Sequence, residues 1–329
     1  MPTPATARGK SDRSIFYIYD LIIVGGGPAG LSAAIHAARL GVQALTLEQY
    51  PVAGGQMVNS VEINNYPGVP NVNGVELAFR MREHAESLGA WFRTGTVKSF
   101  DLAGKVKRVQ LEEEELEAKT VILAMGTEHR VLQIPGEAEL NGHGVSYCAA
   151  GDGPFYQGSD VAVIGGGDSA VGDAIFLAQC CKKVYLVHRR DRLRAEKTLQ
   201  KRLFRLPNVE VIWDHLPVSI EGENQTGALR IKNVKDGSER TLHLDCVFIA
   251  VGVRPLSSLV KDQVELTAES YVLAGEDCRT SVPGVFVAGD LRRRQLREIL
   301  TACADGANAA VSAAEYLSFT EGQEGREAP

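Results

Sequence analysis

The sequence predicts an α/β protein built from two copies of one strand–helix–strand unit, the second copy inserted into the first. Three observations support this prediction. The chain has 329 residues, more than one hydrophobic core usually serves. Residues 20–50 and 160–190 align without a gap at an offset of 140 positions. A late strand-like segment, residues 285–290, again ends in Gly-Asp and returns the chain to the first unit.

Each copy begins with a short apolar run typical of a buried parallel strand. The run passes through three glycines into an Ala- and Leu-rich helical pattern, and a second apolar run follows. These segments lie at 20–24, 28–40 and 42–47 in the first copy, and at 160–164, 168–178 and 183–187 in the second. The pattern predicts two Rossmann-like, three-layer ββα dinucleotide-binding domains.

Two further segments, 120–126 and 246–252, resemble each other and predict strands that return to each sheet and turn on a glycine. A β-excursion precedes each one: the first has the acidic run 112–115 at its tip, and the second covers 209–244. We therefore expect a discontinuous first dinucleotide-binding domain and an inserted second one, after a flexible N-terminus. The expected bounds are 15–129 with 253–329, then 130–252, and 1–14 for the N-terminus.

Composition excludes several classes of protein. The chain carries 41 acidic and 35 basic residues, a formal charge of −6, with no sustained basic run, so we expect no nucleic-acid or anionic-membrane partner. No apolar stretch approaches the ~20 residues that span a bilayer, and no secretory apolar region is present, so we expect a cytoplasmic protein. Six scattered cysteines without a CxxC pair predict no metal site.

The first glycine segment, Gly25 to Gly30, fits G-x-G-x-x-G directly after a strand and at the start of a helix. Gly25 permits the tight turn, Gly27 leaves room for a pyrophosphate, and Gly30 lets helix and strand pack closely. Ala29 lies in the helix start, whose free N–H groups attract phosphate. Glu48 ends the second strand, where a carboxylate accepts hydrogen bonds from a ribose diol.

The second glycine segment is the permitted variant G-x-G-x-x-A, and it predicts a different nucleotide. The position equivalent to Glu48 is basic, and a carboxylate there would repel a 2′-phosphate that guanidinium groups bind, so we expect NADPH rather than NADH. The alternative is a solvated helix face. The residues expected at this site are Gly165, Gly167, Asp168, Ser169, His188, Arg189, Arg190 and Arg194. Two such sites in one chain imply permanently held FAD, visiting NADPH and hydride transfer between them.

From about Tyr19 to Leu317 the sequence resembles the low-molecular-weight thioredoxin reductase family. The matching motifs are GGGPAGLSAA (25–34), GGQM (54–57), NNYPG (64–68), VSYC (145–148), DGPFY (152–156), GGGDSA (165–170), HRRDRLRA (188–195) and the tail from VFVAGD (285–290) to LREILTACADGANAA (296–310). The resemblance implies a homodimer and further flavin contacts from Gly55, Gln56, Asn65, Val97, Ala124, Gly126, Asp290, Arg297, Glu298 and Ile299. Glu298 stands where the family usually has Gln, and a negative charge there would make flavin reduction harder unless Arg292, Arg293 or Arg294 neutralises it.

The redox segment departs from the family pattern. The resemblance implies a Cys-Ala-Thr-Cys-Asp motif, whereas this chain has Cys148-Ala149-Ala150-Gly151-Asp152. Gly151 thus replaces the thiol that in the family faces the flavin. Cys148, which in the family attacks the partner disulfide, and Asp152, which the resemblance implies as the proton donor, are retained as catalytic candidates. Dithiol exchange needs a second thiol to resolve the mixed disulfide. Cys303 is the first candidate for that partner; Cys180 and Cys181 are expected to be packing residues.

We therefore expect an FAD-containing NADPH oxidoreductase of thioredoxin-reductase type, and the destination of its electrons stays open. One destination is a disulfide, in a thioredoxin-like protein or a small molecule, reached through Cys148. The other dispenses with the thiol and reduces ferredoxin, a quinone or oxygen. A third hypothesis, from a different class, is a non-catalytic module that senses the NADPH/NADP⁺ ratio.

Overall fold

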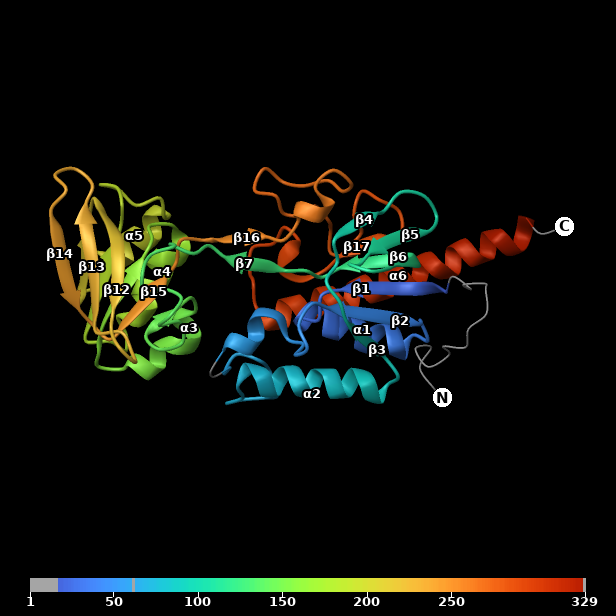
Figure 1. The fold of residues 1–329 in the computed structure, drawn as a ribbon, viewed down its shortest axis with the longest axis horizontal. Helices are drawn as coiled ribbons and strands as arrows, with labels where there is room; N and C mark the ends of the chain where they lie inside the picture. Colours follow the sequence, from blue (N-terminus) through green and yellow to red (C-terminus); the bar gives the residue numbers. More distant parts are fainter. Residues whose placement is uncertain (1–16, 61–62, 328–329) are drawn as a thin grey trace.

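A computed structural model describes residues 17–60 and 63–327, with side chains up to Thr320. The flexible N-terminus predicted at 1–14 lies outside the described residues. The chain forms two lobes joined by a two-stranded antiparallel ribbon of β7 (Thr127–His129) and β16 (Val253–Pro255) (Figure 1). The second lobe occupies the stretch of chain between these two strands, so it is inserted into the first.

The first lobe is organised around a sheet of order β3-β2-β1-β6-β5-β4, with β17 also paired to β6. The strands β3, β2, β1, β6 and β17 run parallel, and β4 and β5 extend the sheet as an antiparallel hairpin on the first half of β6. The strands are β1 (Ile18–Val24), β2 (Ala44–Glu48), β3 (Trp91–Thr94), β4 (Ser99–Asp101), β5 (Lys107–Gln110), β6 (Glu115–Leu123) and β17 (Val285–Val287).

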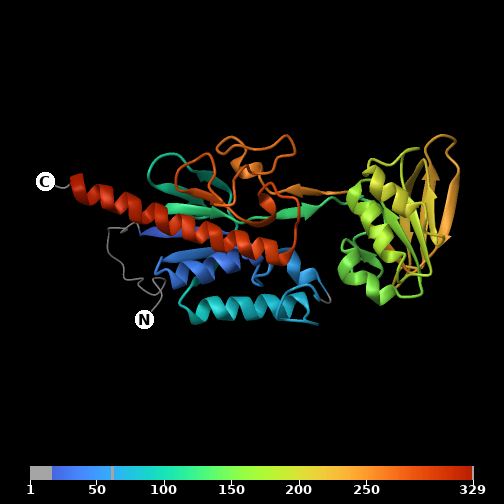
Figure 2. The same ribbon diagram turned by 180° about the vertical axis from the view of Figure 1, so that it is seen from behind.

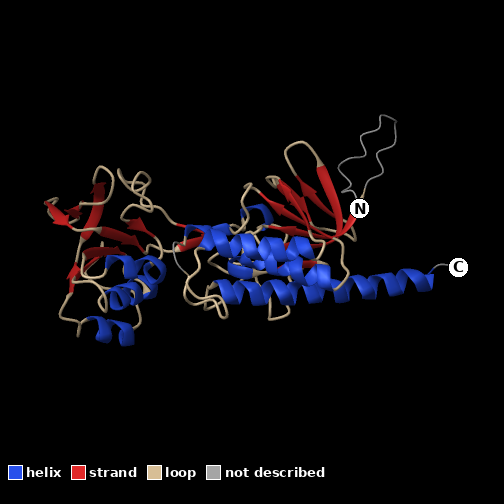
Figure 3. Ribbon diagram, turned by 90° about the horizontal axis from the view of Figure 1, so that it is seen from below, coloured by secondary structure: helices blue, strands red, loops and turns tan. Residues whose placement is uncertain are grey.

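Three helices cover one face of this sheet: α1 (Pro28–Arg39), α2 (Gly74–Ser87) and α6 (Ile299–Glu327) (Figures 2 and 3). Alanines dominate the apolar cluster between β1, α1 and α6, and their small side chains let the helices lie close to the strands. The opposite face buries larger residues of the β4–β5 hairpin and of the segment after β16, such as Phe100 and Val260. Short 3₁₀ turns lie at η2 (Gly55–Asn59), η4 (Ser258–Val260) and η5 (Gly289–Leu291).

The second lobe repeats the same three layers. Its parallel sheet has the order β11-β10-β9-β15-β8, with helices on one face and a three-stranded antiparallel sheet, β12-β13-β14, on the other. The elements are β8 (Val145–Ser146), α3 (Ala149–Asp152), η3 (Gly153–Tyr156), β9 (Asp160–Ile164), α4 (Asp168–Leu177), β10 (Lys183–Val187), α5 (Lys197–Leu203), β11 (Val209–Ile212), β12 (His215–Glu221), β13 (Ala228–Asn233), β14 (Glu239–His243) and β15 (Cys246–Ile249).

The predicted fold class of two Rossmann-like ββα units is confirmed. One boundary was wrong: the second excursion begins at His215, because Val209–Ile212 pairs in parallel with β10 and so belongs to the main sheet. The acidic run 112–115 lies in the β5–β6 turn and at the start of β6, as expected for a solvated tip. Within the described part of the chain, no helix is long and apolar enough to cross a bilayer.

Candidate functional site

The first glycine loop follows β1 and enters α1 with the geometry that each glycine was predicted to allow. Gly25 has φ +111°, and a Cβ there would lie 2.4 Å from the Ala124 carbonyl oxygen. A Cβ at Gly30 would lie 1.8 Å from the Gly25 carbonyl oxygen, so only glycine fits against the strand. A Cβ at Gly27 would instead meet only Gly55 Cα, at 3.8 Å, so this position borders open space. The space that the loop keeps free therefore lies above Gly27.

The second glycine loop repeats this arrangement between β9 and α4. A Cβ at Gly165 would lie 2.5 Å from the Ala250 carbonyl oxygen, which matches the contact between Gly25 and Ala124. Gly167 again borders open space, because a Cβ there would meet only Arg194 Nη2, at 4.0 Å. Neither α1 nor α4 has a side-chain cap at its N-terminus, so the first N–H groups of both helices are available to an anion.

Glu48 and His188 occupy equivalent places beside the middle glycine of their loops, but they face different partners. Glu48 Oε2 accepts a hydrogen bond of 2.8 Å from Gly26 N and belongs to a partly buried side chain. The ring of His188 is buried under Gly166, and its Nε2 lies 3.0 Å from the Arg192 carbonyl oxygen. Burial lowers the pKa of His188, so the ring is neutral at pH 7. His188 thus supports the second loop from below and leaves phosphate contact to the neighbouring arginines.

Arg189, Arg190 and Arg194 are exposed around the second loop, and within the described residues none of them forms an ion pair. Arg194 is held in place by its backbone, because its N–H donates to the Gly166 carbonyl at 2.7 Å. Asp168 stabilises the same turn by accepting a 2.7 Å hydrogen bond from Glu196 N. Ser169 follows in the exposed first turn of α4. Unpaired guanidinium groups beside an uncapped helix start could hold a multiply charged anion.

The segment around η2 lies across the first glycine loop. Gly54 N donates to the Gly26 carbonyl at 2.7 Å, and Gly55, with φ +56°, approaches Gly27 closely. Gln56 Nε2 donates to Thr127 Oγ1 at 3.0 Å, which ties this segment to the start of the ribbon. Ala124 and Gly126 lie at the end of β6 on the same edge of the sheet. The carboxyl edge of the first sheet therefore carries most of the predicted flavin contacts.

Three further predicted contacts are Val97, which lies away from the loops, and Asn65 and Glu298, which pair with each other. Val97 is partly buried and packs on the apolar cluster behind the sheet. Asn65 Nδ2 donates to Glu298 Oε2 at 2.9 Å, immediately before Ile299 begins α6. Arg292 and Arg294 are bound to Asp305 rather than to Glu298, so within the described residues no arginine is paired with this carboxylate.

The segment 290–297 contains buried polar atoms without a partner among the described residues: Asp290 Oδ1, Arg294 Nε and Arg297 Nε. Arg297 lies over the Tyr271 ring at 4.4 Å. Unpartnered buried polar atoms are costly. Gly289, next to Asp290, packs against Ala29 in the uncapped first turn of α1. A ligand carrying hydroxyl and phosphate groups would satisfy the unpartnered atoms, so the residues present fit a flavin dinucleotide.

Cys148 lies at the start of α3, which Figure 1 draws on the side of the second lobe nearer the first. Its N–H donates to Ser146 Oγ at 3.0 Å, and that hydroxyl donates to Asp152 Oδ2 at 2.6 Å. Burial raises the pKa of the Asp152 carboxyl, against the hydrogen bond from Ser146. Although Cys148 is exposed, crowding by protein atoms raises the pKa of its thiol, and three nearby carboxylates, led by Asp152, add to the effect. The thiol is therefore protonated at neutral pH.

Cys303, the predicted partner thiol, lies inside the first lobe. Its Sγ lies 3.6 Å from the Pro28 carbonyl oxygen and 4.0 Å from the Tyr66 hydroxyl, and burial raises its pKa to about 11. Among the described residues, the two thiols in contact are Cys180 and Cys181, with sulfur atoms 3.9 Å apart in the turn after α4. No contact joins Cys148 to another thiol in the part of the chain that the structure describes.

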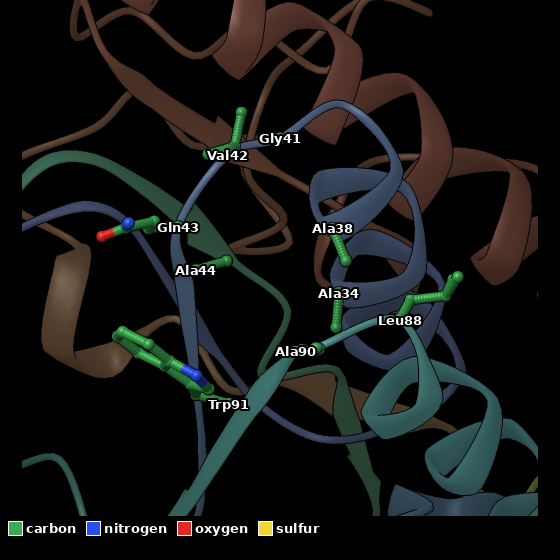
Figure 4. Close-up of a pocket in the computed structure, with 10 residues that line it drawn as sticks. Ala34, Ala38, Gly41, Val42, Gln43, Ala44, Leu88, Ala90 and Trp91 are labelled. Carbon is green, nitrogen blue, oxygen red and sulfur yellow. The ribbon is translucent and has the colours of Figure 1, made fainter. Parts of the chain in front are cut away.

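A hollow on the first lobe lies at the opposite edge of the sheet (Figure 4). Its lining comes from the end of α1, the start of β2, the turn after α2 and the start of β3, including Gly41, Ala44, Leu88 and Trp91. Ligands of open α/β sheets bind at the carboxyl ends of the strands, so this hollow is not the functional site. The described residues also contain no group of three or more His, Cys, Asp or Glu side chains that could hold a metal ion.

Comparison with known proteins agrees with this geometry. Residues 19–306 match the family model described as pyridine nucleotide-disulphide oxidoreductase. The chain belongs to this family. Thioredoxin reductase of Bacillus subtilis (strain 168) is 40% identical over 301 residues, 91% of this chain and 95% of that protein. The bifunctional thioredoxin reductase/thioredoxin of Mycobacterium leprae (strain TN) is 44% identical over 313 residues, 94% of this chain and 68% of that protein.

Among solved structures, thioredoxin reductase from Streptococcus pyogenes MGAS5005 superposes with a TM-score of 0.84 at 43% identity, covering 92% of this chain and 99% of that one. This family member is therefore a thioredoxin-reductase-type flavin oxidoreductase with the matching mixed α/β fold.

Several residues that shape this family member's site were not among the predicted site residues. Thr127, Ser146 and Asp305 accept or donate the hydrogen bonds that hold Gln56, Asp152 and the arginines. Ser146 and Asp305 lie in motifs that resemble the family, but a motif does not show which side chain each of its residues contacts. Their partners lie between 6 and 71 positions away, and the folded chain brings them together.

Proposed function

We propose that the chain oxidises NADPH, reduces FAD and passes the electrons to an external acceptor. The observation that carries this proposal is the pair of matching glycine loops, one beside Glu48 and the other beside three exposed arginines. A carboxylate suits the ribose diol of the flavin's adenosine half, and guanidinium groups suit a 2′-phosphate. NADPH and FAD supply the hydride chemistry when bound, and the protein aligns them.

We assign residues 15–129 and 253–329 to FAD and residues 130–252 to NADPH. The first N–H groups of α1 bind the FAD pyrophosphate above Gly27, and those of α4 bind the NADPH pyrophosphate above Gly167. The FAD set is Gly25, Gly27, Ala29, Gly30, Glu48, Gly55, Gln56, Asn65, Val97, Ala124, Gly126, Asp290, Arg297, Glu298 and Ile299. The NADPH set is Gly165, Gly167, Asp168, Ser169, His188, Arg189, Arg190 and Arg194, with His188 acting through its support of the loop.

The acceptor takes its electrons without an internal disulfide. Position 151 is glycine, and no contact in the described chain joins Cys148 to a second thiol. The raised pKa of Cys148 also keeps the thiolate, the attacking species in exchange, scarce at neutral pH. Ferredoxin, a quinone or oxygen is therefore the favoured acceptor class over a protein or small-molecule disulfide.

A second candidate, disulfide reduction through Cys148 as a single thiol, is favoured by the exposure of that residue and by the retained acid Asp152. The relatives named thioredoxin reductase point the same way, toward a thioredoxin-like partner. In this route Cys148 would attack the substrate disulfide and release one substrate thiol. The two electrons of the reduced flavin would then be needed to break the mixed disulfide, which would restore the Cys148 thiolate and release the second substrate thiol. A non-catalytic sensor fits less well, because both nucleotide loops keep the geometry that brings two cofactors into one chain. We further propose a cytoplasmic homodimer by analogy with the same relatives.

Two experiments test these proposals. Anaerobic mixing of the flavin-loaded protein with NADPH should bleach the flavin absorbance, and an unchanged spectrum would show that hydride transfer does not occur. Turnover with thioredoxin, small disulfides, ferredoxin and quinones should then be compared between the wild type, Cys148→Ser and the matched control Cys180→Ser. We expect turnover of the accepted substrate to be equal in all three; loss in Cys148→Ser alone would establish the thiol route instead.

A further inference from the structure

Asp305 organises a buried cluster of charges in α6, beside the proposed flavin site. Arg292 occupies both of its carboxylate oxygens, with Nε at 2.9 Å from Oδ2 and Nη2 at 2.8 Å from Oδ1. The Arg292 side chain also donates to the carbonyls of Ala274 and Gly275. This bidentate pair neutralises Asp305 and leaves few donors of Arg292 unused.

Arg294 is a second cation on the same carboxylate. Its Nη1 lies 2.9 Å from Asp305 Oδ2, which also accepts from Gly289 N at 3.1 Å. The Arg294 side chain is only 10% exposed, and its Nε has no partner. Because Asp305 is already paired with Arg292, Arg294 is a buried positive charge in excess. A buried charge of this kind is costly unless an anion accompanies it.

Asp290, a second acidic residue close enough to feel the Arg294 charge, does not fill this role. Asp290 Oδ1 is buried and unpartnered, and no ion pair joins Asp290 to Arg294 in the described chain. Arg294 and Arg297 both act on Asp290 electrostatically, which places both cations near this carboxyl. A ligand in the space beside Asp290 would therefore meet a hydrogen-bond acceptor, Asp290, and an anion-binding cation, Arg294.

The start of α1 borders the same space. A Cβ at Gly306, next to Asp305, would lie 2.1 Å from the Ala29 carbonyl oxygen, and one at Gly289 would lie 2.9 Å from Ala29 Cβ. The Asp305 cluster is therefore packed directly on the first turn of α1, whose uncapped N–H groups attract phosphate. A buried guanidinium keeps its positive charge and is stabilised by an anion beside it. In FAD that anion is the pyrophosphate, because the oxidised isoalloxazine ring is neutral.

We infer that Arg294 is a cofactor-contacting residue that binds the flavin pyrophosphate together with the N-terminus of α1, and that Asp305 is its positioning residue. This assignment rests on the proposed function and extends its site by two residues that were not among the predicted cofactor contacts. The ligand class that it selects is a phosphorylated flavin. Riboflavin, which has no phosphate, does not use the contact.

The experiment measures the affinities of the apoprotein for FAD and riboflavin by quenching of flavin fluorescence. Arg294→Gln should raise the Kd for FAD by about 10- to 100-fold, the effect of losing one hydrogen bond from a charged group, and leave riboflavin unchanged. The matched control is Arg293→Gln, an exposed neighbour whose side chain forms no ion pair among the described residues, and it should change the FAD Kd less than about twofold. Equal Kd values for the two variants would overturn the assignment, and so would a parallel loss of riboflavin.

Asp305→Asn tests the positioning role in a double-mutant cycle. It should weaken FAD binding in the wild type but add little in the Arg294→Gln background; fully additive losses would show that Asp305 acts only on folding. If Arg294→Gln does not fold, Arg294→Met and Arg294→Lys replace it in the FAD-binding measurement. We expect Arg294→Met to lose FAD affinity and Arg294→Lys to keep more of it. Failure of the wild type to bind FAD would overturn the proposed function itself, whereas FAD binding that ignores Arg294 overturns only this inference.

Discussion

Arg194→Gln is the substitution that tests the nucleotide preference of the second lobe. The Arg194 backbone is fixed by its 2.7 Å hydrogen bond to the Gly166 carbonyl, and its guanidinium lies 4.0 Å from the open position above Gly167. The change therefore removes charge beside the loop without moving the loop. A hydrogen bond to a charged group contributes about 1.5–3 kcal/mol, and exposure of Arg194 places the effect at the lower end.

We expect kcat/KM for NADPH to fall by about tenfold, with NADH unchanged because it has no 2′-phosphate. Anaerobic stopped-flow measurement of flavin reduction reports this step for both nucleotides, independently of the final acceptor. Arg192→Gln is the control, since Arg192 is exposed in the same turn and uses its backbone carbonyl, not its side chain, to contact His188. An equal loss with NADPH and NADH, or an equal loss in the control, would refute a 2′-phosphate contact at Arg194.

Three further predictions follow from the geometry. Gly30→Ala should abolish flavin binding or folding, because its Cβ would lie 1.8 Å from the Gly25 carbonyl oxygen. Gly172→Ala lies in open space within α4 and should stabilise the protein by about 0.5–1 kcal/mol. Flavin content and urea unfolding distinguish the two variants, and equal behaviour would contradict this packing. Burial raises the pKa of Asp173 to about 6, so between about pH 4 and 6 the folded protein holds a proton that the unfolded chain releases. The free energy of unfolding should therefore fall as pH rises through this range. In Asp173→Asn this slope should vanish, and urea unfolding at pH 7 should show a gain in stability of about 1–3 kcal/mol. Burial instead lowers the pKa of Lys107, so the unfolded chain binds more protons and stability should rise with pH just below 10.5; Lys107→Met should lose that component, and an unchanged difference between the two proteins at pH 8 and 10 would refute it.

The sequence by itself determined the two glycine loops. Their roles depend on backbone conformation and on neighbours a few residues away, such as Gly25 and Gly30, so local spacing was sufficient to predict them. The difference between Glu48 and the arginines after His188 could also be predicted, because both positions lie at the carboxyl end of the second strand of the same repeat.

The tertiary structure decided how side chains far apart in the sequence meet. It placed the His188 ring under its loop, added Val209–Ile212 to the parallel sheet and put Cys303 beside Tyr66. It also joined Arg292 and Arg294 to Asp305 instead of Glu298. Each outcome depends on which of several nearby partners a side chain reaches after the helices and strands have packed. Such contacts join residues far apart in the chain, so they leave no periodic pattern in the sequence from which they could be predicted.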